Sequence, residues 1–494
     1  GKQMAVQKSE LEKIVGKENV VDDKNTLKVY SHDQSFTSPR MPDCAVFVEN
    51  ASQIQDIVKL ANETLTPLIP YSSGKNLHGA SIPDQGGIII NMTKMKEISH
   101  LDKDNWHVQI EPGVTFEELQ EYLNKEGFRA MIPFGAPTKR SALTSYLERD
   151  PVLAAANFET GNTLMMDTEV VLASGEIFRT GNWASGGDPG SPAGPIRNRI
   201  YRMFTGAQGT MGIMTKMVIQ VEPLQKIRKL FFIPFNSLSE AVEPIRRIQR
   251  KEIGNECLLL NKFNLATILT DSWDIPDSFP VEPVATEEFE EIQKNLPAYT
   301  MIICLNGHPR RPEEKIAYES EALKEICDDM NLELLESLHN VPGAENIMIK
   351  EINRPFKILK KFNYKGSVQN LCFKAPLNKI TDLEEKLNKL AIKNNYPVSD
   401  IGVFLLPMER ARAIHCEFDL HSNATDTKER TEVESLWLKA SSELINSGAY
   451  FDRPYGPWAD MMYSRAANYT QMLRKLKKET DPNNILNPGK ICFA

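Results

Sequence analysis

A run of small and polar residues separates two short apolar segments near the start of the chain. The stretch is "YSSGKNLHGASIPDQGGIII", residues 71–90, with "PLIPY" before it and "GGIIINM" at its end. Glycine and serine let a backbone come close to a ligand, and consecutive amide groups over residues 72–76 can hold a pyrophosphate without a helix. The pattern predicts a strand, a loop and a second strand. The loop is either a plain tight turn or a binding loop for a polar or anionic ligand.

A second stretch of small residues, "PFGAPTKRSALTSYLERD" at 133–150, follows the next strand–helix unit of the sequence. It is either an ordinary loop that enters a helix at Ser141 or a second binding loop. The stretch "SGKNLHGAS" does not fit GxGxxG, and the chain has no GxxxxGK[ST] sequence, so the usual nucleotide fingerprints fail. Two loops after consecutive strand–helix units can converge on one elongated ligand, and this convergence is the more specific prediction.

The elements around these loops are predicted from their periodicity. A strand at 45–49, a helix over "ASQIQDIVKLANET" and a strand ending at Tyr71 form a β-α-β unit. Two capping boxes are predicted, one with Ser52 and Gln55 and one with Thr115 and Glu118. A strand at 107–111, a hairpin at 168–181 and a strand at 211–223 complete this half of the chain.

After Pro223 the pattern changes to alternating strands and helices. The predicted elements are strands at 230–235, 257–260 and 300–304, helices at 237–252, 312–329 and 379–394, and two strands within 402–420. A repeated strand–helix–strand order of this kind indicates a split β-α-β domain with an antiparallel sheet. The proline-rich and acidic segment 273–291 is expected on the surface, and the segment from 450 to 490 is expected to hold one helix.

Composition excludes several classes of protein. The 494 residues are 41% hydrophobic and 25% charged, which allows two or three domains with sizeable cores. A net charge of −8 disfavours binding to nucleic acid, and no apolar stretch is long enough for a membrane span. The seven cysteines are scattered without a CxxC pair, so we expect reduced thiols in a cytoplasmic protein and no metal site.

Five segments together resemble one flavoprotein family. They are "PYSSGKNLHGASIPDQGGIIINMTKM", "VQIEPGVTFEELQEYLNKEGF", "TEVVLASGEIFRTG", "GTMGIMTK" and the terminal "DPNNILNPGK". Their order and spacing are similar to those of the vanillyl-alcohol oxidase and p-cresol methylhydroxylase family. The resemblance implies an α+β protein: a two-subdomain FAD-binding fold of the p-cresol methylhydroxylase type, with an α+β cap domain on an antiparallel sheet. It places the FAD-binding domain at 1–223, the cap at 224–449 and a returning C-terminal segment at 450–494.

The resemblance also implies the cofactor, FAD, and the residues that hold it. The first loop is expected to wrap the diphosphate, and the other positions match flavin, ribityl or adenine contacts of the family. These residues are Tyr71, Ser72, Ser73, Gly74, Lys75, Asn76, Leu77, Gly135, Thr138, Ser141, Gly161, Gly212, Ile213 and Lys490.

The chain departs from the family where the chemistry takes place. Ala413 stands where covalent members carry a histidine or tyrosine, so we expect FAD to be bound non-covalently. His415, two residues on, points to the same face of a strand and is either a structural histidine or an alternative attachment point. Phe451 replaces an arginine of the phenol-oxidising members, and a family carboxylate falls near Ala136. The active site is therefore rebuilt.

The remaining candidates for catalysis lie in "YFDRPYGPW" and in the first loop. Tyr450 matches a family tyrosine and is expected to contact the substrate oxygen, with Arg453 as the cation that replaces the displaced arginine. His78, where a loop tyrosine falls in the family at 78 or 79, is expected to act as a general base near neutral pH. A solvated loop with packed aromatic residues is the alternative for the C-terminal cluster.

These residues predict an FAD-dependent oxidoreductase that removes hydride from a hydroxylated, aromatic or phenolic, small molecule. One alternative is a D-2-hydroxyacid dehydrogenase of the lactate or glycolate type, but "NGHPRRP" and "SGAYFDRPYG" lack the clustered histidines of such enzymes. Another alternative is a flavin-binding electron-transfer subunit. The expected partners are the small-molecule substrate, a protein or quinone electron acceptor and a second copy of the chain in a homodimer.

Overall fold

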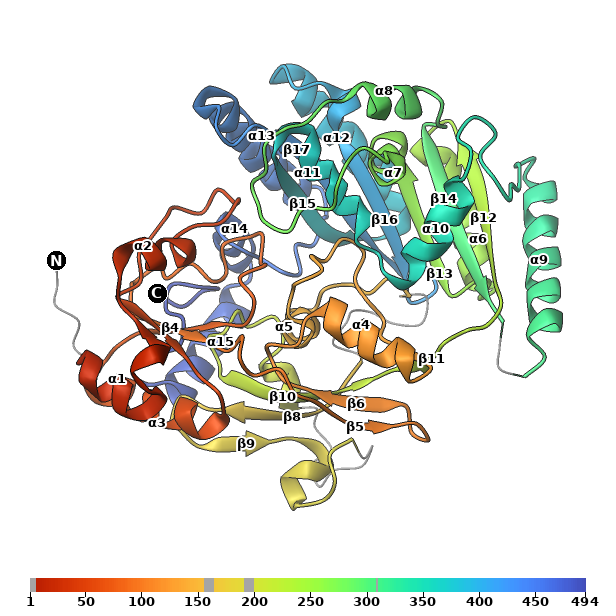
Figure 1. The fold of residues 1–494 in the computed structure, drawn as a ribbon. Coiled ribbons are helices and arrows are strands. Elements are labelled where there is room, and N and C mark those ends of the chain that lie inside the picture. Colours follow the sequence, from red (N-terminus) through yellow and green to blue (C-terminus); the bar gives the residue numbers. More distant parts are fainter. Residues whose placement is uncertain (1–5, 155–163, 191–199, 308–309) are drawn as a thin grey trace.

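The computed structural model describes residues 6–154, 164–190, 200–307 and 310–494. The N-terminal half and the C-terminal segment form the lower part of Figure 1, and the middle of the chain forms a separate sheet with its helices above them. The structure therefore contains a lower part and an upper part, which we call the cap, in an α+β arrangement as expected. The predicted boundaries at 223 and 449 stay a prediction.

The first sheet of the lower part carries the loop of small residues. Its strand order is β1-β2-β4-β3, with β1 (Val20–Val21), β2 (Cys44–Phe47), β3 (Leu68–Tyr71) and β4 (Ile88–Asn91). Both β2 and β3 run parallel to β4, which is buried along its whole length. Helix α3 (Ala51–Thr64) connects β2 to β3. Because β3 and β4 are parallel neighbours, residues 72–87 must return from one end of the sheet to the other.

The second sheet of the lower part has the order β5-β6-β10-β8-β9 and is antiparallel throughout. Its strands are β5 (Ile98–Asp102), β6 (His107–Ile110), β8 (Met165–Val171), β9 (Ile177–Arg179) and β10 (Ile213–Gln220). Two helices, α4 (Phe116–Lys125) and α5 (Ala142–Leu147), pack on it through an apolar cluster that contains Phe116 and Tyr146. The short pair β7 (Phe128–Arg129) and β11 (Glu222–Pro223) leads toward the cap.

The cap is a six-stranded antiparallel sheet in the order β12-β14-β13-β16-β17-β15. The strands are β12 (Arg228–Phe235), β13 (Glu256–Asn261), β14 (Tyr299–Asn306), β15 (Ser367–Ala375), β16 (Gly402–Met408) and β17 (Ala413–Ser422). Alternate residues of a strand point to opposite faces. On β17, Cys416 and Phe418 pack against the outer helices, whereas His415, Glu417 and Asp419 face the other way.

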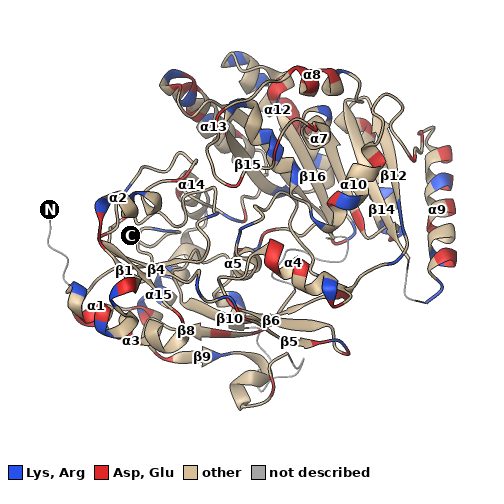
Figure 2. Ribbon diagram, in the orientation of Figure 1, with Lys and Arg blue, Asp and Glu red and all other residues tan. Residues whose placement is uncertain are grey.

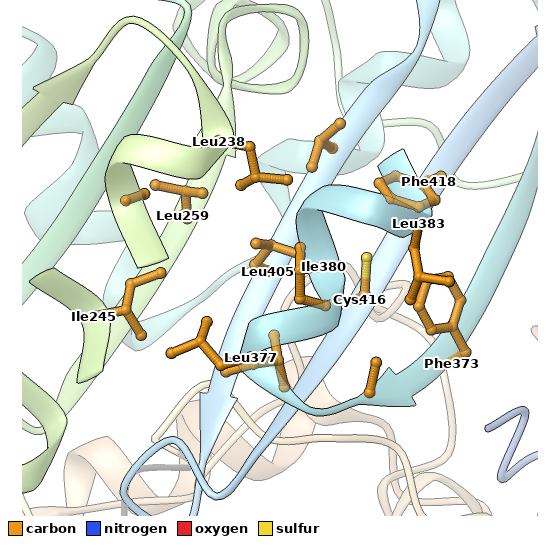
Figure 3. Packing of buried hydrophobic residues seen from close by; sticks show 14 of the residues in the cluster. Leu238, Ile245, Leu259, Phe373, Leu377, Ile380, Leu383, Leu405, Cys416 and Phe418 are labelled. Atoms are coloured by element: carbon orange, nitrogen blue, oxygen red, sulfur yellow. The ribbon is translucent and has the colours of Figure 1, made fainter. Parts of the chain in front are cut away.

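Helices cover both faces of the cap sheet. The outer face packs against α6 (Leu238–Arg250), α9 (Pro312–Asp329), α12 (Ile380–Lys393) and α13 (Thr427–Asn446), and Figure 3 shows Leu238, Leu259, Leu383 and Leu405 in that cluster. The inner face carries α7 (Lys262–Leu269), α10 (Ala344–Asn353) and the 3-10 helix η7 (Lys357–Lys361). Acidic and basic residues are interspersed along the exposed helix α9 (Figure 2).

The chain returns to the lower part through α14 (Pro457–Tyr463) and α15 (Ala467–Thr480). Residues after α15 lie beside β3: the Leu68 amide donates to the Ile485 carbonyl at 2.7 Å, and the Asn487 amide donates to the Leu68 carbonyl at 2.8 Å. Both ends of the chain thus contribute to one domain. Over the described residues, no helix is long and apolar enough to cross a membrane, and all seven cysteines are free thiols.

Three local predictions were wrong. Helix α3 begins at Ala51 and is capped by Asn50, whose Oδ1 accepts the Gln53 amide at 3.0 Å, so Ser52 lies inside the helix and forms no capping box. The C-terminal segment holds two helices, because Gly456-Pro457 starts a first short helix before α15. The segment 273–291 is not wholly on the surface, since Trp273 and Phe289 are buried and stack at 4.8 Å. The capping box of Thr115 and Glu118 is confirmed.

Candidate active site

The two loops of small residues meet. The hydroxyl groups of Ser72 and Thr144 lie 2.6 Å apart, and the Ser141 amide donates to the Ser73 hydroxyl at 3.1 Å. Ser141 also caps α5, because its hydroxyl accepts the Thr144 amide at 3.1 Å. The predicted convergence of the loops is thereby observed. Small residues at these positions bring the two loops into hydrogen-bonding contact through their hydroxyl groups.

The backbone of the first loop is suited to an anionic ligand. Among the described residues, the amides of 73–77 have no hydrogen-bond acceptor, although they are consecutive and lie beside two cavities. Gly74 has φ +66°, a conformation that turns the chain locally and that residues with a Cβ rarely adopt. A run of unpaired N–H groups of this kind is an anion-binding concavity. These residues therefore fit the diphosphate of FAD.

A cavity of about 90 Å³ lies where this loop, the second loop, the cap and the C-terminal segment meet. We call it the central cavity. Its wall in the lower part is formed by residues 75–78, 133–137, Arg140 and 150–151. The cap and the C-terminal segment supply Ile358, Leu359, Lys361, Phe362, Asn370, Cys372, Phe404, Glu417, Arg453 and Tyr455. The second cavity, of about 390 Å³, shares residues 75–77 with it.

A buried triad of charges holds the C-terminal segment against the second loop. Asp150 receives Arg453 Nη1 on Oδ1 at 2.6 Å and Arg140 Nε on Oδ2 at 3.0 Å. Burial alone raises the pKa of Asp150, but the two guanidinium groups together hold it below its usual value. One carboxylate thus serves two arginines, and positive charge remains in excess at this side of the cavity.

An aromatic pair lines the cavity beside this triad. The rings of His78 and Tyr455 stack with centroids 5.0 Å apart and an angle of 6°. Burial, together with the charge of Arg453, lowers the pKa of His78 to about 4, so the imidazole is neutral at pH 7. The prediction that His78 titrates near neutral pH is therefore wrong, because its pKa in the fold lies well below 7.

Behind Tyr455 lies a buried carboxyl group. Oε2 of Glu148 is 3.4 Å from the Tyr455 hydroxyl, and Oε1 accepts the Gln208 amide at 3.1 Å. Burial raises the pKa of Glu148 to about 7. Glu148 therefore changes its charge near neutral pH, unlike Asp150 or His78.

The cap side of the cavity is built from η7, the adjacent Phe362 and the strands β15, β16 and β17. Glu417 Oε1 lies 3.0 Å from His415 Nε2, and Asp419 Oδ2 pairs with Lys361 Nζ at 2.9 Å. Burial raises the pKa of Glu417, but the hydrogen bond and charge of His415, together with the charges of Lys361 and Arg453, outweigh it and bring the value to about 2. Among the described residues no group of three or more histidine, cysteine or acidic side chains could hold a metal ion.

Tyr450 lies outside the central cavity. It is 56% exposed, its backbone pairs with Lys374, and it lines a different cavity together with Phe451 and Asp452. Arg453 and His78, the other two predicted catalytic residues, both line the central cavity. The tyrosine that accompanies them is Tyr455, two residues beyond Arg453.

The other predicted site residues fall into three groups. Lys75, Asn76, Leu77 and Gly135 line the central cavity, and Tyr71, Ser73 and Gly74 line the second one. Lys490 holds the loop from behind, with Nζ 2.9 Å from the Gly79 carbonyl and 3.1 Å from Asp84. Thr138, Gly212 and Ile213 do not line the central cavity, the last two lying at the start of β10, and Gly161 lies outside the described residues.

The sequence analysis missed Tyr455, Glu148, Asp150 and Glu417. Tyr455 was available in the aromatic cluster after Tyr450, and Glu148 and Asp150 end the quoted second loop stretch, in "LERD". Asp150 gains its significance from an ion pair with Arg453, 303 residues away, and Glu148 from a contact with Tyr455, 307 residues away. No local sequence pattern predicts contacts between residues so far apart in the chain.

Two family models match the chain. The "FAD binding domain" covers residues 42–181, and the "FAD linked oxidases, C-terminal domain" covers residues 458–491. Both models describe FAD-linked proteins, and the chain fits the FAD-linked oxidase family of p-cresol methylhydroxylase and vanillyl-alcohol oxidase. It is an FAD-dependent oxidoreductase, and both family models include segments that the resemblance had singled out.

Two similar proteins illustrate how far this FAD-linked oxidase matches its relatives. The 4-cresol dehydrogenase [hydroxylating] flavoprotein subunit of Pseudomonas putida is 25% identical, over 97% of this chain and 93% of that one. Glycolate oxidase subunit GlcD of Bacillus subtilis is 23% identical, over 98% of this chain and 96% of the other. The two names denote different substrates at almost equal identity.

The fold matches solved structures over nearly the whole chain. A structure of p-cresol methylhydroxylase with substrate bound has a TM-score of 0.80 at 20% identity, covering 98% of this chain and 96% of that one. A 4-ethylphenol oxidase from Gulosibacter chungangensis in complex with isoeugenol has a TM-score of 0.79 at 19% identity, covering 98% and 95%. The predicted p-cresol methylhydroxylase type of fold is confirmed.

Proposed function

We propose that this FAD-linked oxidase removes hydride from a hydroxylated aromatic molecule, at a carbon beside or para to the hydroxyl group, and passes the electrons to an acceptor. The observation that carries the proposal is the convergence of Arg453, Tyr455 and His78 on one cavity next to the loop suited to FAD. FAD, when bound, accepts the hydride and supplies the redox chemistry. The side chains supply orientation and charge.

The charge of the cavity favours an anionic substrate oxygen. Its lining contains the cations Lys75, Arg140, Lys361 and Arg453 against the carboxylates Asp150 and Glu417. Asp419, which neutralises Lys361, still leaves positive charge in excess. A phenol that ionises as it reacts is stabilised by such a surplus.

Each residue then has a distinct role. Arg453, fixed by Asp150, is the cation that faces the substrate oxygen, and the hydroxyl group of Tyr455 exchanges a hydrogen bond with the same oxygen. His78 stays neutral and orients Tyr455 by stacking. We assign the tyrosine role to Tyr455 and not to Tyr450, because Tyr450 lies outside the central cavity.

A second candidate is oxidation of a D-2-hydroxy acid, since a carboxylate also suits the positive surplus and one relative bears the name glycolate oxidase. The aromatic stack of His78 on Tyr455 and the side chains of Phe134, Phe362 and Phe404 favour an aromatic ring instead. The cavity therefore fits a phenol better than a small aliphatic acid.

The deciding experiment is anaerobic reduction of the purified holoenzyme. 4-Alkylphenols and 4-hydroxybenzyl alcohols are expected to bleach the flavin absorbance, whereas D-lactate and glycolate are expected to leave it unchanged. Bleaching by the hydroxy acids alone would replace the first proposal by the second. A protein that no compound bleaches would be an electron-transfer subunit.

We also propose non-covalent FAD. Ala413 carries no nucleophile, and His415, the alternative attachment point, is 1% exposed and lies 3.0 Å from Glu417. Acid precipitation should leave the flavin in the supernatant. A flavin-bearing peptide that contains His415 would contradict this. The electron acceptor and a homodimer stay predictions, which acceptor assays and sedimentation would test.

A further inference from the structure

Glu148 is a buried acid that the proposed function has not yet used. It is 5% exposed and does not line the central cavity, yet its Oε2 is 3.4 Å from the hydroxyl of Tyr455, which does. The backbone amide of Gln208 fixes its other oxygen at 3.1 Å. Tyr455 therefore separates Glu148 from any substrate, with the phenolic hydroxyl as the connection.

We propose that Glu148, acting through Tyr455, takes up the proton that the substrate hydroxyl loses during oxidation. This inference rests on the proposed function. The substrate O–H bond breaks and its proton passes to the Tyr455 oxygen, while the phenolic proton of Tyr455 passes to Glu148 Oε2. The two electrons of the cleaved C–H bond leave with the hydride, which FAD accepts. Glu148 is a positioning residue in this scheme, and Tyr455 is the catalytic residue.

The other acids near the cavity are already engaged. Asp150 receives Arg453 on one oxygen and Arg140 and Ser145 on the other. Glu417 is held ionised by His415, with a pKa of about 2. Neither carboxylate can gain a proton easily near neutral pH.

Glu148, in contrast, titrates in the useful range. Burial raises its pKa to about 7, and the charged groups that face it are Arg140, which lowers the pKa, and Asp150, which raises it. The Gln208 amide and the Tyr455 hydroxyl also favour its ionised form. A proton acceptor works best with a pKa close to the working pH.

The test measures flavin reduction against pH in stopped flow, under anaerobic conditions, with a 4-alkylphenol that bleaches the wild type. The wild-type rate is expected to rise with an inflection near pH 7. Glu148→Gln should lower the rate at least about 10-fold at pH 7.5 and remove the inflection, and Glu148→Asp should restore it in part. Glu111→Gln is the control, because Glu111 is also a partly buried acid with a raised pKa but accepts the Glu97 amide far from the cavity lining.

A binding measurement gives a readout without turnover. Phenol itself has no alkyl C–H bond to oxidise, and its ultraviolet difference spectrum reports whether it is bound as phenolate. In the wild type, the negative charge of ionised Glu148 behind Tyr455 should keep bound phenol neutral up to a higher pH, whereas in Glu148→Gln the ionisation of bound phenol should shift to lower pH. An unchanged transition in the variant would overturn the inference.

The outcomes separate the two proposals. If no phenol bleaches the wild type, the proposed function fails. If phenols bleach it but Glu148→Gln keeps the wild-type inflection, only the role of Glu148 fails. If Glu148→Gln does not fold, Tyr455→Phe replaces it, and persistence of the inflection in that variant overturns the proton path.

Discussion

The two segments that meet at the central cavity, residues 72–79 and 450–455, are held in place by different forces. The first is fixed by hydrogen bonds to backbone and small polar groups: Ser73 to the Ser141 amide, and the Gly79 amide to Asp33 at 2.7 Å. The second is fixed by buried charges, with Arg453 on Asp150 at 2.6 Å and Asp452 near Lys374 at 3.3 Å. Both segments place a ring in the cavity wall, at His78 and Tyr455.

This difference has a physical consequence. A hydrogen bond contributes about 1 kcal/mol between neutral groups and about 1.5–3 kcal/mol where a carboxylate accepts, as between Gly79 and Asp33, and its loss is local. A buried ion pair contributes little net stability, but removal of one partner strands the other charge away from water. Segment 450–455 should therefore be more sensitive to single substitutions than the loop at 72–79.

The largest expected effect follows from Asp150, which serves both arginines. Asp150→Asn leaves two buried guanidinium groups with one neutral partner and should lower the free energy of unfolding by about 3–5 kcal/mol. Urea unfolding followed by fluorescence measures this change. Asp277→Asn is the control, since its ion pair with Lys139 is 3.4 Å long and mostly exposed, and its loss should cost less than about 0.5 kcal/mol. Equal effects of the two substitutions would contradict the comparison.

The loop residue His78 should make the free energy of unfolding depend on pH. Its pKa falls from about 6.5 in the unfolded chain to about 4 in the fold, so the unfolded state binds the proton more readily. The stability that neutral His78 contributes is complete above pH 6.5 and is lost as the pH falls toward 4. The loss amounts to about 3 kcal/mol.

The measurement compares wild type and His78→Asn by urea unfolding at pH 7.5 and pH 4.5. The wild type should lose more stability than the variant over this interval. Identical losses in the two proteins would mean that His78 is not desolvated in the fold.

Substitutions of Tyr455 and Tyr450 test which of the two tyrosines contacts the substrate. Tyr455→Phe should slow flavin reduction by about 100-fold if its hydroxyl shares a proton with the substrate. Tyr450→Phe, on the side of a different cavity, should stay within about twofold of the wild type. Stopped-flow reduction with the same phenol measures both. The reverse order of effects would restore the role that sequence comparison gave to Tyr450.

The same contrast explains what could be predicted from the sequence. The strands around residues 72–87, the convergence of the two loops and the antiparallel cap follow from local periodicity and from small residues in fixed order. Tyr455, Glu148 and Asp150 could not be assigned because their meaning arises from partners about 300 residues away, such as 303 for Arg453 and Asp150. The shift from Tyr450 to Tyr455 has the same cause. Tyr450 was assigned because it matches a family tyrosine, whereas in the structure it is 56% exposed and lines a different cavity.

The smallest expected effect tests a local rule in the lower part of the molecule. The sequence pattern predicted a capping box of Ser52 and Gln55 for helix α3, whereas the structure has Asn50 as the N-cap, with Oδ1 accepting the Gln53 amide at 3.0 Å. Asn50→Ala should lower the free energy of unfolding by about 1 kcal/mol, because the first turn of the helix then exposes an amide without a partner. Ser52→Ala should change it by less than about 0.5 kcal/mol, since Ser52 is an exposed residue inside the helix, where alanine is the better helix former. Urea unfolding measures the free energy of unfolding of both variants. A larger loss from Ser52→Ala than from Asn50→Ala would mean that the predicted capping box of Ser52 and Gln55 starts this helix, and that Asn50 does not.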